Sequence, residues 1–256
     1  MSSSFRRLPF ICWIILPSIM TIAQSLEAPG ELEDGFKSKN WAIAGTYYSK
    51  LLQEGPSSKL YMDLGKLFME ESYPKHANFY FELAVSLDAQ NAEVKEALQS
   101  SADRIAYLER RFHEFSEKAG KENDPTYYGR LSAIRFYMGD RREGLEILRS
   151  ALQNYDNDAR LLPLAGVFQK QLQFEGTTVK SMYQDFQTAL EEQNVDLALN
   201  ILGQINFLSI GHKQVVTLME MAQKAFPGKI NVESALLLTE FVKQFNQVDN
   251  AEGQEP

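Results

Sequence analysis

The stretch from Leu64 to Ala84, LGKLFMEESYPKHANFYFELA, places very small and very large apolar side chains at helical spacing on both sides of a break. Gly65 precedes the break and Ala77 follows it, and Phe68 and Phe81 accompany them. Small residues at a helix crossing let the two axes approach, and large neighbours then fill the remaining space. The stretch therefore predicts two helices packed against each other as a hairpin.

The pattern recurs along the chain. Residues 58–91 and 125–158 each form a unit of about 34 residues, and this period with these sizes resembles the tetratricopeptide repeat, a helix-turn-helix unit. The resemblance implies an all-α, TPR-like α-solenoid of stacked antiparallel helix pairs over residues 26–245, an open curved rod with an inner groove. The residues at the defining places are Leu64, Gly65, Phe68, Ala77, Phe81 and Ala84 in the first unit, Gly139, Gly144 and Ala151 in the second, and Ala44 and Tyr48 in an earlier helix.

Three further segments, 26–57, 92–124 and 159–245, fit the repeat less well and are expected to be degenerate units. In 92–124, Arg111 stands where a small residue is expected, which favours two long helices at a looser crossing. Arg160 to Leu172 is expected to form a lone helix that stops at the break QFEGTT, residues 173–178.

Cap residues mark several helix ends. Asp124 followed by proline predicts a helix start, and Gly139 predicts the end of that helix. Asp140 with Glu143 fits a capping box for the next helix, and Asn194 fits the cap of a later one.

Residues 1–25 have the composition of an export signal. Two arginines precede the apolar run from Leu8 to Ile22, and the small residues around Ala23 suit signal peptidase cleavage. As a helix the run would span about 22 Å, less than the ~30 Å hydrocarbon core, so a short N-terminal anchor is the weaker alternative. The only cysteine, Cys12, lies in this run. An exported chain without disulfides favours the bacterial periplasm. The polar, acidic end, 246–256, is expected to be a disordered tail.

The charge of the chain disfavours one class of partner. The formal net charge is -8, and loss of the two arginines in residues 1–25 would make it more negative. Nucleic-acid binders usually carry a basic stripe, which this sequence lacks. We expect no nucleic-acid partner, and no stable membrane span in the mature form.

The sequence contains no recognisable catalytic, cofactor or metal-binding pattern, so we expect no enzyme activity, no cofactor and no metal. His76, His113 and His212 fall in different segments and read as exposed helix residues. Ser72 and Lys75 have the spacing of a serine-lysine hydrolase pair, but no companion motif accompanies them.

The resemblance implies a partner-binding surface on the first helix of each unit. We expect a protein-protein interaction scaffold or adaptor of the cell envelope, which binds a partner helix or an extended segment in the groove. The alternatives are that these residues pack within the array, that a catalytic site is assembled only in the fold, or that the chain self-assembles into a homo-oligomer. The candidate groove residues are Lys59, Met62, Lys66, Met69 and Glu70 in the first unit, and Thr126, Gly129, Ala133, Phe136 and Tyr137 in the second.

Overall fold

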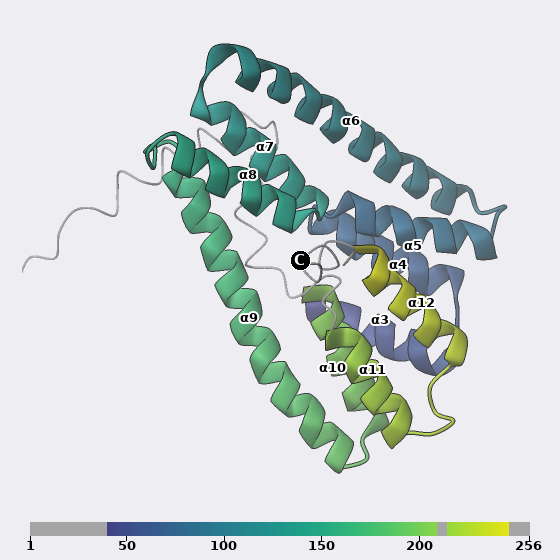
Figure 1. The fold of residues 1–256 in the computed structure, drawn as a ribbon. Helices are drawn as coiled ribbons and strands as arrows, with labels where there is room; N and C mark the ends of the chain where they lie inside the picture. Colours follow the sequence, from purple (N-terminus) through teal and green to yellow (C-terminus); the bar gives the residue numbers. More distant parts are fainter. Residues whose placement is uncertain (1–39, 209–213, 246–256) are drawn as a thin grey trace, which may run out of the picture.

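The computed structural model describes residues 40–208 and 214–245, and every regular element in those ranges is an α-helix (Figure 1). The all-α prediction is therefore confirmed for the described part of the chain. None of the described helices combines the length and the hydrophobicity needed to span a bilayer. The helices are α3 (Asn40–Glu54), α4 (Ser58–Glu70), α5 (Pro74–Leu87), α6 (Ala92–Glu122), α7 (Pro125–Met138), α8 (Arg141–Asn154), α9 (Leu162–Glu191), α10 (Val195–Leu208), α11 (Gln214–Ala225) and α12 (Val232–Phe245).

Two of the expected helix hairpins are present, α4 with α5 and α7 with α8. In the first pair, a β-carbon on Gly65 would lie 2.4 Å from Cε1 of Phe81, so only glycine permits this approach. In the second pair, the Ser132 hydroxyl donates a hydrogen bond to the carbonyl oxygen of Gly144 at 2.6 Å. The small residues thus lie at the crossings, as the sequence predicts.

Two helices are longer than expected. The segment 92–124 does not form two helices, because α6 is continuous and has no glycine or proline in its central turns. The break predicted at 173–178 is also wrong. Gly176 lies inside α9, where Thr177 and Thr178 donate their hydroxyls to carbonyl oxygens four residues earlier. Because these hydroxyls are hydrogen-bonded within the helix, the helix continues through a stretch whose sequence resembles a loop.

Most of the predicted caps are present. The Asp124 carboxylate accepts the amide of Thr126 at 3.0 Å, and Gly139 ends α7 with φ of +102°. Asn194 accepts the amide of Leu197 at 3.1 Å. The capping box at Asp140 is absent, because its carboxylate accepts instead from the Lys75 ammonium of α5. A charge-assisted bond replaces the cap.

The last three helices return to the beginning of the described chain (Figure 1). Helix α10 packs closely along α3, where a β-carbon on Gly203 would lie 2.4 Å from Cβ of Tyr48. Helix α12 lies against α4 and α5, because Phe241 packs on Phe68 and Tyr80. The first and last helices therefore share one hydrophobic core. The expected open rod has no such contact between its ends.

Helix α9 connects the two regions of the molecule. Its first half packs on α7 through Phe168, whose ring stacks on Phe136 with centroids 3.9 Å apart and an interplanar angle of 8°. Its last turns carry Phe186 and Ala189 into the shared core with α10. Between these anchors, Gln173, Gly176 and Lys180 are exposed, so the middle of α9 has a free surface on which sites can form.

Candidate functional site

The candidate groove residues of the first unit divide between surface and core. Lys59, Lys66 and Glu70 are exposed, and Met69 is half-buried. Met62 is buried in the shared core, which makes it a packing residue. The ammonium of Lys66 lies 2.7 Å from a carboxylate oxygen at the start of α6.

The candidate groove residues of the second unit are mostly covered by the chain itself. Gly129, Ala133 and Phe136 are buried beneath the first half of α9. Thr126 and Tyr137 are half-buried. This face of α7 contacts α9. Its three buried residues therefore pack within the array, as one of the alternatives predicts.

The residues at the defining repeat places have a structural role. All of them are buried except Gly139, which is partly exposed in the turn between α7 and α8. The buried members are Ala44, Tyr48, Leu64, Gly65, Phe68, Ala77, Phe81, Ala84, Gly144 and Ala151.

His76 was expected to be exposed, and this prediction is wrong. Its side chain is fully buried, and its ring lies between Phe68 and Phe245 with centroids 5.6 and 4.0 Å away. Neither ring nitrogen has a hydrogen-bond partner in the described part of the chain. Burial, together with the charge of neighbouring Lys75, lowers the pKa of His76 to about 3. The imidazole is therefore a neutral packing group. His113 is exposed as expected, and His212 lies outside the described residues.

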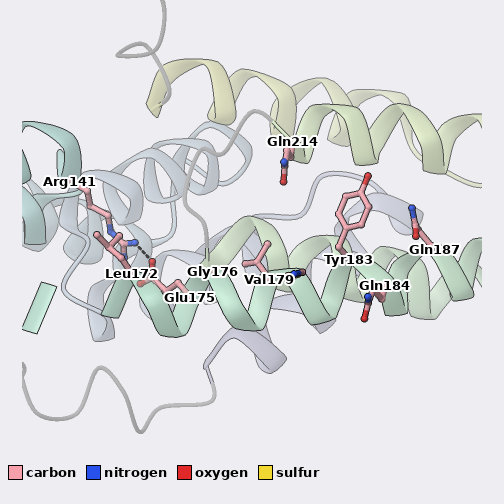
Figure 2. Close-up of a pocket in the computed structure, with 10 residues that line it drawn as sticks. Arg141, Leu172, Glu175, Gly176, Val179, Tyr183, Gln184, Gln187 and Gln214 are labelled. Atoms are coloured by element: carbon pink, nitrogen blue, oxygen red, sulfur yellow. Dashed lines mark hydrogen bonds and ion pairs between the residues drawn. The ribbon is translucent and has the colours of Figure 1, made fainter. Parts of the chain in front are cut away.

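One groove runs along α9 on the side facing α11, and we call it the α9–α11 groove. Figure 2 shows Arg141 and Glu175 at one end, Tyr183 and Gln187 towards the other, and Gln214 of α11 across from them. Its volume is about 730 Å³. The full lining consists of Arg141, Leu172, Glu175, Gly176, Val179, Lys180, Tyr183, Gln184, Gln187 and Gln214.

A second groove, the α8–α9 groove, lies on the side of α9 that faces α8, with a volume of about 820 Å³. It lies between the apolar residues of α8 and those of the first half of α9, where Leu148 is buried against Phe168 and Leu145 and Leu152 are half-buried. Its apolar lining is Leu145, Leu148, Leu152, Ala165, Phe168 and Leu172, and its polar rim is Arg149, Gln153, Asn157, Gln169 and Gln173.

The pair Arg141 and Glu175 lies at one end of the α9–α11 groove. The Arg141 guanidinium donates to the Glu175 carboxylate and to the Tyr73 hydroxyl, and its charged carbon lies 4.9 Å from the Tyr73 ring centroid. Both side chains are largely buried, at 16% and 12% exposure. Burial and the nearby Glu175 charge raise the pKa of Tyr137. The junction therefore fixes α8 against α9 and α5.

Both grooves can offer apolar contact and amide hydrogen bonding to a ligand. The α9–α11 groove contains one carboxylate, from Glu175, and the α8–α9 groove lining has none. Among the described residues, no group of three or more potential metal ligands converges. This chemistry suits recognition of a polypeptide.

Sequence reasoning did not identify either groove. Leu145, Leu148 and Leu152 show amphipathic spacing, but only the position of α9 reveals that Leu145 and Leu152 stay half-buried at a groove. No protein-family model, no curated protein and no solved structure matches the chain.

Proposed function

We propose that this protein is a non-enzymatic protein-binding scaffold of TPR-like helical-repeat type, which acts in the bacterial cell envelope. Its partner inserts an amphipathic helix into the α8–α9 groove. The observation that carries this proposal is a groove of about 820 Å³ between α8 and α9, in which the half-buried Leu145 and Leu152 of α8 lie beside an apolar row on α9.

The spacing of the lining residues matches the needs of a third helix. Leu145, Leu148 and Leu152 on α8 are separated by three and four residues, and the apolar lining residues of α9, from Ala165 to Leu172, have the same separations. Two such rows form the walls of a site for a helix with its own apolar stripe. Phe168 is almost fully buried at the base, so the site has a fixed floor.

The polar rim of the α8–α9 groove determines which side chains we expect on the partner helix beside its apolar stripe. It consists of four amide side chains and Arg149, and the lining contains no acidic residue. Amides donate and accept hydrogen bonds, and the arginine attracts carboxylates. We therefore expect a partner helix whose apolar stripe is bordered by polar and acidic residues.

The repeat assignment and the location rest on separate supports. The two hairpins α4–α5 and α7–α8, with glycines at their crossings, support a TPR-like solenoid type. The basic and apolar pattern of residues 1–25 supports export and lies outside the described residues.

Site-specific photo-crosslinking in cells tests this proposal. A photoreactive amino acid at Leu152 lies in the groove, whereas the same group at Ser150 lies on the exposed side of α8 and is the matched control. We expect a discrete protein adduct from position 152 alone, and we expect Leu145→Asp to abolish it without changing the melting temperature greatly, because Leu145 is only half-buried.

Three outcomes would contradict the proposal. Equal adducts from both positions would indicate a nonspecific surface, and no adduct from Leu152 would indicate an empty groove. An adduct with twice the mass of the chain would favour self-assembly instead.

A further inference from the structure

We propose that residues 26–39 of this chain bind along the α9–α11 groove, so that the segment before α3 covers the middle of α9. This inference concerns a different surface from the α8–α9 groove and does not depend on the function proposed for that groove. It rests on where the described chain begins, on the reach of the segment, and on matching chemistry.

The described chain begins beside α9. The Asn40 amide donates to the carboxylates of Glu70 and Glu71 at 3.1 and 3.0 Å, which fixes the start of α3. The Trp41 ring packs edge-on against Phe174 of α9 with centroids 5.8 Å apart. The described chain therefore begins next to the helix that forms the groove.

A small cavity of about 30 Å³ lies between this starting point and the Arg141 end of the groove. Its lining includes Trp41 together with Arg141 and Glu175, and the last two also line the α9–α11 groove. The start of α3 therefore lies near the Arg141 end of the groove.

The segment is long enough to follow the groove. Residues 26–39 can reach up to ~46 Å when extended. The stretch of α9 from Leu172 to Gln187 spans about 22 Å at ~1.5 Å per residue. This difference leaves length for a turn at Gly35 before the segment runs along the helix.

The charges of the two surfaces are complementary. Residues 26–35 contain four acidic residues and no basic residue. Lys180 in the groove is exposed and forms no ion pair with the part of the chain that the structure describes. An acidic segment laid along α9 would supply carboxylates to this ammonium.

The apolar and hydrogen-bonding groups also correspond. Leu26, Leu32 and Phe36 are the large apolar residues of segment 26–39, and Leu172 and Val179 are apolar groups of the groove. The groove further offers Tyr183 and the amides of Gln184 and Gln187, which are suited to an extended backbone.

Disulfide scanning tests the proposal in the full chain. Cys12→Ser removes the only cysteine, so every disulfide then formed joins two introduced residues. One cysteine replaces Val179 in the groove, and a second is placed in turn at each position from 30 to 36. We expect rapid intramolecular disulfide formation at one or two positions, because the bond requires Cα atoms within about 7 Å.

Gln173→Cys is the matched control, since it lies on α9 but lines the α8–α9 groove. Equal rates with Gln173 and Val179, or no disulfide with Val179, would overturn the proposal. Preferential reaction of the Val179 cysteine with one placed at Val248 would assign the groove to the C-terminal segment and would also overturn it. Disulfide-linked dimers in place of intramolecular bonds would assign it to a second copy, with the same consequence.

A protease measurement provides an independent readout. Trypsin cleaves after Lys37 and Lys39, and cleavage requires the segment to leave the groove. We expect Val179→Asp to accelerate this cleavage about tenfold, which corresponds to ~1.4 kcal/mol. Leu152→Asp, in the α8–α9 groove, serves as the control and should leave the rate unchanged. An unchanged rate in Val179→Asp would contradict the proposal, whereas loss of the Leu152 photo-adduct alone would contradict only the proposed function.

Discussion

The ring of Phe245, at the end of α12, stacks on the ring of His76 of α5 with centroids 4.0 Å apart and planes inclined by 29°. A β-carbon on Gly139 would lie 2.1 Å from Cε1 of the same imidazole. Three parts of the molecule, α5, α12 and the turn between α7 and α8, therefore meet at a single buried histidine.

This contact predicts a pH-dependent stability. His76 is neutral in the folded protein with a pKa of about 3, whereas an unfolded histidine binds a proton near pH 6.5. The unfolded state gains the proton first as the pH falls, so the stabilisation is complete above about pH 6.5 and is lost between about pH 6.5 and 3. The free energy of unfolding should decrease by up to ~1.4 kcal/mol per pH unit from this group, measured by urea denaturation.

His76→Leu should remove this component of the pH dependence, although it changes the packing. His113→Leu is the control, since the His113 side chain is 79% exposed on α6. A pH profile in His76→Leu identical to that of the parent would show that another group is responsible.

Gly65→Ala should destabilise the protein. The new methyl group would lie 2.4 Å from Cε1 of Phe81, and both residues are enclosed by the crossing of α4 and α5. Overpacking of this kind costs about 1–3 kcal/mol. Thermal or urea unfolding at neutral pH measures the effect.

Gly166→Ala in α9 is the matched substitution for Gly65→Ala. No atom lies within 4 Å of the position of its β-carbon, so helix propensity dominates and stability should rise by ~0.5–1 kcal/mol. Equal effects of the two alanines, in sign and size, would show that the crossing is not tightly packed.

Glu175→Ala should be strongly destabilising because it leaves the Arg141 guanidinium buried without its carboxylate. Breaking a buried pair from one side costs about 3 kcal/mol or more. The double variant Arg141→Met with Glu175→Leu should recover part of this loss, because it removes the isolated charge together with its partner. Urea unfolding of the three variants measures the coupling.

Glu93→Ala removes the partner of Lys66 in an exposed pair, and we expect no measurable change there. If Glu175→Ala were as harmless as Glu93→Ala, the junction between α8 and α9 would not depend on this ion pair.

The local structure could largely be predicted from the sequence. The sizes of Gly65, Ala77 and Phe81 predicted the α4–α5 hairpin, and the Asp124 and Gly139 caps predicted the limits of α7. These features depend on neighbours within one or two helices, and sequence spacing records such contacts directly.

The misassigned features depend on distant partners. His76 was expected to be exposed because no sequence pattern places α12 over it, and Asp140 was expected to cap α8 because its pairing with Lys75 crosses 65 positions. Spacing along one helix cannot predict which outside element covers each face.

The candidate site shows the same limit. Phe136 was expected to face a partner, yet Phe168 of α9 covers it. Residues 173–178, a glycine-containing stretch that resembles a loop, are instead helical and form part of the wall of the α9–α11 groove.

The pairing of α3 with α10 also imposes an order on biosynthesis. The Ser49 hydroxyl bonds to the backbone of Asp196, a residue that is made 147 positions later. A chain that emerges from its N-terminus therefore presents the apolar face of α3 long before its cover has been synthesised, and closure is delayed until the final quarter of the polypeptide appears. Until α10 has been made, the face of α3 that packs on it stays without this cover.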